Sequence, residues 1–282
     1  MSRAATTGKY RAFRTLHESG CFVIPNPWDI GTTRYLQHMG FKALATTSAG
    51  FAFAQGIADG AVTRTMMLGH IAELVAASDL PFNADFEAGY ANDAEGVAES
   101  VRLCVETGVA GLSIEDATGD AAKPLYDLDH AVARMRAARA AIDKTGCDVL
   151  LTGRAECFLV GLPDLDEAIK RLRAYSDAGA DCLYAPGIRT REQIEAVIKA
   201  VAPKPVNVLM STASGLTVND LASFGVRRIS VGSTVMRVAF SAFVRSMTEI
   251  SEQGTFDSFA GILPHAELNK FFRDDLPRRP KP

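Results

Sequence analysis

The sequence of 282 residues has few cysteines, and none of them are paired at the spacing of a metal-binding or redox motif. The five cysteines are scattered along the chain, at Cys21, Cys104, Cys147, Cys157 and Cys182. Structural zinc sites need closely spaced cysteine pairs, and small secreted domains use cysteines in disulfides. The pattern therefore argues against a cysteine-ligated metal or iron–sulfur site and favours a reduced, cytoplasmic protein.

Long uncharged runs and one-sided charge are also absent, although 48% of the residues are hydrophobic. No stretch is long enough to span a bilayer, and residues 1–8 lack the apolar centre of a signal peptide. The formal net charge is -3, with acids and bases interspersed. Because there is no basic stripe, neither nucleic acid nor a membrane surface is expected as a partner.

The chain alternates between short apolar segments and helical periodicity, eight times over. Such alternation predicts a parallel α/β architecture, and the length fits one barrel domain over residues 1–282, since a (β/α)8 TIM barrel needs roughly 250 residues. An open doubly wound sheet is less favoured because no Gly-x-Gly-x-x-Gly turn follows the first strand. The expected strands are 22–26, 43–47, 81–87, 111–115, 148–154, 181–185, 205–210 and 228–231. The expected helices are 8–19, 30–39, 63–78, 93–107, 128–144, 164–178, 190–201, 217–224 and 233–253.

One further apolar-periodic segment, residues 255–273, follows the eighth helix, and residues 277–282 are expected to be disordered. A surplus amphipathic helix either caps the bottom of the barrel or packs on a second copy of the chain. The helix before it is apolar over much of its circumference, more than one barrel can cover. We therefore expect residues 233–273 to act as C-terminal helices for oligomerisation in a homodimer or homotetramer.

Three of the expected strands begin apolar and end charged. Asp85 and Glu87 end one strand and are expected on one face, Glu115 ends the next, and Arg154 and Glu156 end a third. A solvated strand end or a helix cap would explain any one of them. Three that agree in position indicate the carboxyl-terminal mouth of a barrel, where catalytic groups collect.

Three neighbouring carboxylates cannot all stay ionised without a cation, because like charges raise one another's pKa. Oxygen ligands without a nearby histidine favour Mg²⁺, or Mn²⁺, over zinc. We assign Asp85, Glu87 and Glu115 to this metal site, with Asp59 as a further contact. Arg154 then faces the metal and suits a carboxylate bound through two hydrogen bonds.

The turn Ser48-Ala49-Gly50 ends the second strand and offers a hydroxyl and backbone N–H groups to a carboxylate or oxyanion. Together with Arg154 and the metal, it suits an α-keto acid whose enolate is stabilised by the metal. Trp28, after the first strand, and Asn207, on the seventh, are further expected substrate contacts. No lysine ends a strand, so a Schiff-base aldolase is disfavoured.

Taken together, the motifs resemble the phosphoenolpyruvate mutase/isocitrate lyase superfamily, in register from about residue 20 to residue 255. They are Thr47-Ser48-Ala49-Gly50, Asp85-x-Glu87-x-Gly89-Tyr90, Ser113-Ile114-Glu115-Asp116 and Gly153-Arg154-Ala155-Glu156. The resemblance implies a Mg-dependent barrel that makes or breaks C–C or P–C bonds beside a pyruvate-like enolate. It implies that some of the metal-site carboxylates act through water, and that the eighth helix is swapped between subunits.

Two departures from the family's pattern bear on the reaction. The family often has Asp-x-Asp where this chain has Asp85-x-Glu87, whose longer arm still reaches a metal-bound water. The loop at residues 117–126 has neither the cysteine nor the histidine of the isocitrate and methylisocitrate lyases, so those two activities are not expected. The asparagine of the mutase-type loop is missing too.

The leading hypothesis is a Mg-dependent lyase or decarboxylase that acts on a small α-keto or 2-hydroxy dicarboxylate. Arg154 and Ser48 orient the carboxylate, Tyr90 or Glu156 relays a proton, and Lys123 contributes if its loop closes inward. A P–C bond enzyme, a phosphonopyruvate or carboxyphosphonoenolpyruvate mutase or hydrolase, is the alternative. A non-catalytic α-keto-acid-binding barrel is the third hypothesis, which an open loop would favour.

Overall fold

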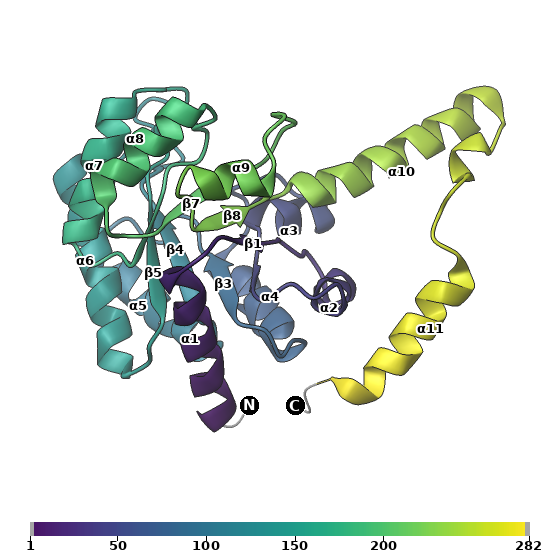
Figure 1. Ribbon diagram of the computed structural model, residues 1–282, viewed down its shortest axis with the longest axis horizontal. Coiled ribbons are helices and arrows are strands. Elements are labelled where there is room, and N and C mark those ends of the chain that lie inside the picture. The colour runs from purple at the N-terminus through teal and green to yellow at the C-terminus, as the bar shows by residue number, and fades with distance from the viewer. Residues whose placement is uncertain (1–2, 280–282) are drawn as a thin grey trace.

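The computed structural model describes residues 3–279 and confirms the (β/α)8 barrel (Figure 1). Eight parallel strands pair in the order β1-β8-β7-β6-β5-β4-β3-β2. Between β1 and β2 the ring is closed by single hydrogen bonds, from Ala45 N to Pro25 O at 3.0 Å and from Asn26 Nδ2 to Thr46 O at 2.8 Å. The strands are β1 (Phe22–Ile24), β2 (Leu44–Ala45), β3 (Phe82–Asp85), β4 (Gly111–Glu115), β5 (Leu150–Arg154), β6 (Cys182–Tyr184), β7 (Val206–Leu209) and β8 (Arg228–Ser230).

The strand positions agree with the sequence prediction, and so do the helices that follow them, with one addition. Helix α3 begins directly at Ser48, where a loop was expected, because Thr47 caps it by accepting a hydrogen bond from Gly50 N at 3.1 Å. The helices are α1 (Arg3–Glu18), α2 (Ile30–His38), α3 (Ser48–Ala54), α4 (Arg64–Ala76), α5 (Ala94–Glu106), α6 (Leu128–Thr145), α7 (Leu165–Asp177), α8 (Arg191–Val201), α9 (Val218–Ser223), α10 (Thr234–Gln253) and α11 (His265–Asp275). No helix in this part of the chain is both long and apolar enough to cross a membrane.

Helix α1 closes the amino-terminal end of the barrel. Phe13 is fully buried against Gly111 at the start of β4, where an added Cβ would lie 2.6 Å from the Phe13 ring. His17, one turn later, reaches Arg228 inside the barrel, with 3.4 Å between Nε2 and Nη1. Its Nδ1 lies 2.8 Å from Phe13 O. Because α1 fills this end, the C-terminal segment is not needed as a cap.

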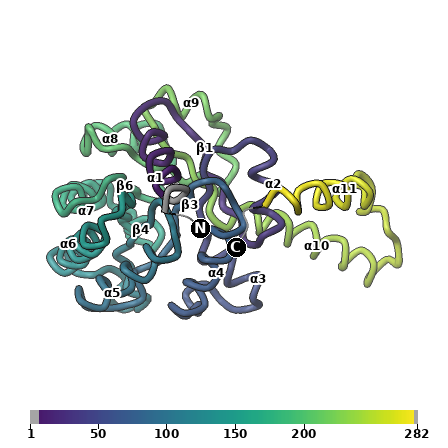
Figure 2. The backbone as a smooth tube through the Cα atoms, turned by 90° about the horizontal axis from the view of Figure 1, so that it is seen from below, coloured from purple at the N-terminus to yellow at the C-terminus, as the bar shows by residue number. Residues whose placement is uncertain are grey.

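The C-terminal segment forms an arm that leaves the barrel and returns to it (Figures 1 and 2). The single segment expected at 255–273 is broken: α10 ends at Gly254, with φ of 69°, and α11 begins only after Pro264. A buried ion pair, Arg34 Nη2 to Asp275 Oδ1 at 2.6 Å, fastens α11 to α2. The expected disorder from residue 277 is corrected in part, since a short 3-10 helix covers Leu276–Arg278; residues 280–282 lie outside the described residues.

His17 predicts how stability depends on pH. Burial, and then the charge of Arg228, lower the pKa of His17 to about 3. In the unfolded chain a histidine pKa is about 6.5, so the folded state binds fewer protons. The part of the free energy of unfolding that neutral His17 contributes is complete above pH 6.5. It is lost as pH falls from 6.5 towards 3, by up to about 1.4 kcal/mol per pH unit.

Urea unfolding at pH 7 and pH 5 should show a smaller loss of unfolding free energy in His17→Gln than in the wild type. The same change at exposed His38 should leave the loss unchanged; equal losses in all three proteins would contradict a neutral, buried His17.

Candidate active site

The carboxyl ends of the strands surround a cavity of about 170 Å³. Six of the side chains or turns expected from the sequence line it: Ser48, Ala49, Asp59, Asp85, Arg154 and Asn207. Tyr184, Arg228 and Ser230 line it as well, although the sequence reasoning did not select them. A cavity below the roughly 300–1,000 Å³ of drug-sized pockets suits a small substrate.

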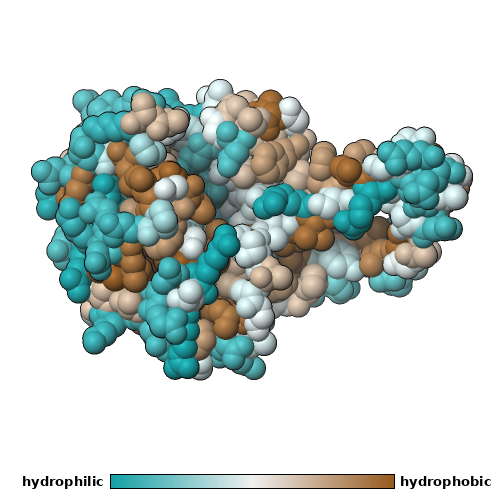
Figure 3. Space-filling model, turned by 90° about the horizontal axis from the view of Figure 1, so that it is seen from above, coloured by the Kyte–Doolittle hydropathy of each residue, from teal (hydrophilic) through white to brown (hydrophobic). Residues whose placement is uncertain are grey.

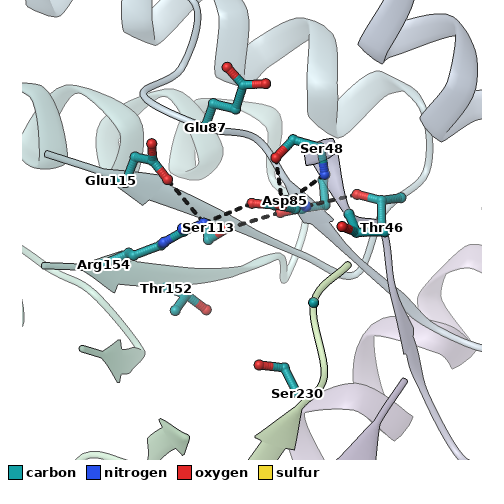
Figure 4. A network of polar contacts seen from close by, with 12 residues as sticks. Thr46, Ser48, Asp85, Glu87, Ser113, Glu115, Thr152, Arg154 and Ser230 are labelled. Carbon is teal, nitrogen blue, oxygen red and sulfur yellow. Dashed lines mark hydrogen bonds and ion pairs between the residues drawn. The ribbon is translucent and has the colours of Figure 1, made fainter. Parts of the chain in front are cut away.

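The guanidinium of Arg154 is the centre of the charged side chains at the mouth (Figure 4). Its Nη1 lies 3.1 Å from Asp85 Oδ1 and 3.0 Å from Glu115 Oε2, while Nε donates to Glu156 Oε1. Asp85 and Glu115 are the last residues of β3 and β4, and Glu156 lies two residues after the end of β5. One cation thus joins three adjacent strands, and the predicted convergence of these residues is observed.

Asp85 connects this cluster to the second strand. Its Oδ2 accepts hydrogen bonds from the backbone N–H and the hydroxyl of Ser48, both at 2.9 Å (Figure 4). Its own N–H donates to Thr46 Oγ1 at 2.8 Å. The first residue of α3 is therefore positioned by a carboxylate, and Ser48 lies beside Arg154 at the cavity.

Glu87 and Tyr90 lie beyond the strand rather than on it. β3 ends at Asp85, and Glu87 has a φ of 46°, so strand alternation does not put Glu87 on the face of Asp85 as expected. Glu87 accepts a hydrogen bond from the Tyr90 hydroxyl at 3.1 Å. Burial, and then the charge of Asp85, raise the pKa of Glu87 to about 7. Figure 4 shows its carboxylate turned away from Asp85.

The mouth carries more acids than Arg154 can neutralise. Burial raises the pKa of Glu115 well above its usual value and also raises that of Glu156, although Arg154 opposes both shifts. Burial, followed by the charge of Asp85, raises the pKa of Asp59. A group of oxygen donors that carries excess negative charge is the kind of site that binds a hard divalent cation.

The donors are not gathered into a ready-made ligand set. Within residues 3–279, no three histidine, cysteine, aspartate or glutamate side chains are grouped closely enough to hold a metal ion. The Arg154 guanidinium stands between Asp85 and Glu115, and Glu87 faces Tyr90. The residues therefore fit Mg²⁺ by the chemistry of their oxygen donors. The separation of these carboxylates agrees with a metal site in which some of them bind through water.

Seven of the expected residues do not line this cavity: Glu87, Tyr90, Glu115 and Glu156, which lie in the charged cluster described above, and Gly50, Trp28 and Lys123. Gly50 donates its N–H to Thr47, and Trp28 lines a separate apolar groove between α2 and α11. The Nζ of Lys123 is exposed and lies 2.5 Å from Asp127. Its loop folds on itself through a bridge between Ala117 and Leu125, so this lysine does not point inward.

Asp116 follows Glu115 but faces the opposite side of β4, away from the cavity. Its Oδ1 accepts the backbone N–H of Glu156 at 2.8 Å, and its Oδ2 accepts from Arg171 at 3.0 Å and from the Tyr175 hydroxyl. Asp116 thereby fixes the chain on which Glu156 is carried.

Arg228 and Ser230 on β8 and Tyr184 on β6 were missed by the sequence reasoning. A signal for Arg228 was available, because an arginine inside an apolar strand segment is the feature that marked Arg154. Ser230 and Tyr184 carried no such signal, since both residue types are common in strands.

Comparison with known proteins agrees with this site. Residues 13–251 match the family profile described as phosphoenolpyruvate phosphomutase. The chain is 30% identical to an oxaloacetate decarboxylase of Paraburkholderia xenovorans, covering 89% of this chain and 84% of that protein. A crystal structure of a candidate lyase/mutase from Burkholderia cenocepacia is 48% identical, with a TM-score of 0.93 and coverage of 95% and 98%. Oxaloacetate acetylhydrolase in complex with oxalate is 27% identical, with a TM-score of 0.84 over 96% of each chain.

The Asp116 contacts predict a change in stability. Asp116→Asn removes the buried carboxylate partner of Arg171 and leaves the partly exposed Glu167 as its remaining ion-pair partner, which should lower the free energy of unfolding by about 1.5–3 kcal/mol. Glu167→Gln, at the partly exposed second partner of Arg171, is the matched control and should cost about 0–1 kcal/mol. Equilibrium urea unfolding measures both. Equal losses in the two variants would contradict the anchoring role of Asp116.

Proposed function

Because this chain belongs to the phosphoenolpyruvate mutase/isocitrate lyase superfamily, we propose that it is a Mg²⁺-dependent lyase that cleaves a C–C bond in a small α-keto or 2-hydroxy carboxylate. The observation that carries the proposal is the placement of Arg154 and Ser48 beside an excess of strand-end carboxylates at one small cavity. A related protein named oxaloacetate decarboxylase supports an α-keto dicarboxylate such as oxaloacetate as the first substrate to test.

Asp85, Glu87, Glu115 and Asp59 would hold the metal, some through water. When bound there, Mg²⁺ supplies Lewis-acid stabilisation of a developing enolate oxygen. Arg154 and Ser48, whose hydrogen-bonding groups meet at Asp85, can turn to the carboxylate of a bound substrate. A guanidinium holds a carboxylate through two parallel hydrogen bonds, which fixes the plane of the keto acid.

The bond-breaking step transfers no group to the protein. In a decarboxylation, the carboxylate beside the scissile bond leaves as CO₂, and its bonding electron pair remains on the substrate as a pyruvate enolate. A proton must then reach the former carboxylate-bearing carbon. The Tyr90 hydroxyl, held by Glu87, and the Glu156 carboxyl, held by Arg154, are the groups we assign to this proton.

Turnover with and without metal tests this function. Pyruvate release from oxaloacetate, 2,3-dimethylmalate and phosphonopyruvate should be measured in Mg²⁺, in EDTA, and after restoring Mg²⁺ or Mn²⁺. We expect release from a C–C substrate that is lost in EDTA and restored by either metal. Glu115→Gln should lower the rate by at least about a hundredfold, in the range seen when a group that stabilises the transition state is removed. Glu106→Gln, on the exposed face of α5, should not.

Other outcomes would favour the alternatives. Turnover of phosphonopyruvate alone would establish the P–C enzyme. Binding of oxalate or pyruvate without turnover of any compound would establish the binding-only barrel, the hypothesis that the outward-facing Lys123 favours. A rate unchanged by EDTA would contradict the metal site.

We further propose that the arm assembles two or more copies of this chain. Several large apolar side chains on α10 and after it are exposed, including Phe243 at 57% and Ile262 at 64% (Figure 3). Soluble monomers rarely leave apolar patches of this kind in water. A second copy that packs along α10 would cover them, which is consistent with a homodimer or homotetramer.

This assembly is tested by light scattering at micromolar concentration. The wild type should exceed the monomer mass of 30.2 kDa, and deletion of residues 255–282 should dissociate it or make it insoluble. Phe243→Asp should dissociate it too, because a charge would be buried in the interface. Lys170→Asp, on exposed α7, is the control and should keep the wild-type mass. A wild-type mass of about 30 kDa would contradict the proposal.

A further inference from the structure

Arg228 lies inside the barrel, at the floor of the active-site cavity, and its charge has no negative partner. Its side chain is 3% exposed, yet it lines the cavity. Among the described residues, no carboxylate oxygen lies within 4.0 Å of its nitrogens. Its partners are neutral: Asn207 Oδ1 at 2.9 Å, Thr152 Oγ1 at 3.1 Å, and, at 3.4 Å, Asn83 Oδ1 and His17 Nε2.

A buried charge without a counter-ion is expensive, so its surroundings ordinarily supply one. Arg34 shows the usual solution in this same protein, since Asp275 neutralises it. Buried Arg134 also lacks a carboxylate partner, but it lies outside the barrel, donates to backbone carbonyls of Ala88 and Ala91, and lines no part of the cavity. Arg228 is therefore distinguished by position: an unneutralised guanidinium faces a cavity that takes a small ligand.

The hydrogen bonds of Arg228 also determine which groups in the cavity wall above it can donate a hydrogen bond to a ligand. Its Nε–H requires the oxygen of the Asn207 amide, so the Asn207 NH₂ must face Ser230. Ser230 Oγ accepts from that NH₂ at 2.9 Å. The Ser230 hydroxyl is thus left as a donor, either to the neighbouring Tyr184 hydroxyl or into the cavity. In either case one hydroxyl hydrogen of this pair remains to be donated to a ligand.

We propose that Arg228, acting with Asn207, Ser230 and Tyr184, forms a second anion subsite that makes the enzyme selective for substrates with two negative groups. This inference rests on the proposed function, which uses Arg154 and Ser48 for the first carboxylate. The two walls line one cavity of about 170 Å³, so a short dicarboxylate reaches both. The second carboxylate is the counter-ion that the barrel floor lacks.

Calorimetric binding of two matched ligands in Mg²⁺ tests the subsite. Malate and 2-hydroxybutyrate share a 2-hydroxy carboxylate head and a four-carbon chain, and differ only in a carboxylate or a methyl group at C4. The wild type should bind malate about ten- to a hundredfold more tightly, as expected for charge-assisted hydrogen bonds to one carboxylate. Arg228→Met should remove most of this preference by weakening malate alone, and Arg228→Lys should restore part of it.

Three further variants separate the possible causes. Ser230→Ala should reduce the preference without changing the charge, and it serves as the test if circular dichroism shows that Arg228→Met does not fold. Arg227→Gln, adjacent in sequence but bonded to Gly20 O outside the cavity, should keep the full preference. Arg154→Lys should weaken both ligands alike, because both use the first carboxylate site.

Equal binding of malate and 2-hydroxybutyrate by the wild type would overturn the subsite, and so would binding of neither. A preference that survives both Arg228→Met and Ser230→Ala would overturn it as well, and a parallel loss of both ligands in Arg228→Met would show that Arg228 is only structural. These outcomes are separate from the turnover assay. A protein that prefers malate but cleaves no substrate would retain the subsite and lose the proposed lyase function.

Discussion

The structure of the mouth depends on one guanidinium shared by three carboxylates. Asp85, Glu115 and Glu156 lie at or just after the ends of adjacent strands, and their charges would repel one another in a largely buried setting without Arg154. Through Asp85 the same cluster holds the first turn of α3. Any cation or substrate that enters must therefore exchange contacts with Arg154 rather than fill an empty space, which couples binding to rearrangement of the cluster.

The barrel contains two arginines in opposite electrostatic surroundings. Arg154 is surrounded by more acid than it can neutralise, whereas Arg228 has only neutral partners. The cavity between them consequently has an acidic wall, suited to a cation, and a basic floor, suited to an anion. A ligand with a metal-binding head and a negatively charged tail would satisfy both at once.

The arm and the site are physically connected through α3. Its amino end carries Ser48, and its carboxyl end borders a groove formed with α10 by Phe53, Ile57, Met236 and Phe240. A second copy seated on α10 would contact the helix that carries Ser48, whose hydroxyl we propose as a substrate contact. Packing through α3 would then link the proposed assembly to the proposed activity, and Ser233, at the start of α10, itself lines the cavity of its own barrel.

Sequence alone determined the elements and most of the mouth. The barrel follows from the alternation of apolar segments with helical periodicity, which depends on local propensity and burial. Asp85, Glu115, Arg154 and Glu156 were identified because charges are rare in buried strands, and their convergence follows from parallel strand ends lying together. The outward turn of Asp116 was decided by its partners on α7, which lie more than fifty residues away and leave no local pattern.

Tertiary structure decided the finer chemistry of the site. The positive φ of Glu87 moved it off the strand face, and only the folded loop showed that Lys123 pairs outward with Asp127. The role of Arg228 depended on what surrounds it: α1 brings His17, and β3, β5 and β7 bring Asn83, Thr152 and Asn207. A sequence specifies which charges enter the interior, but whether a buried charge is neutralised depends on groups from distant segments, and these meet only in the folded barrel.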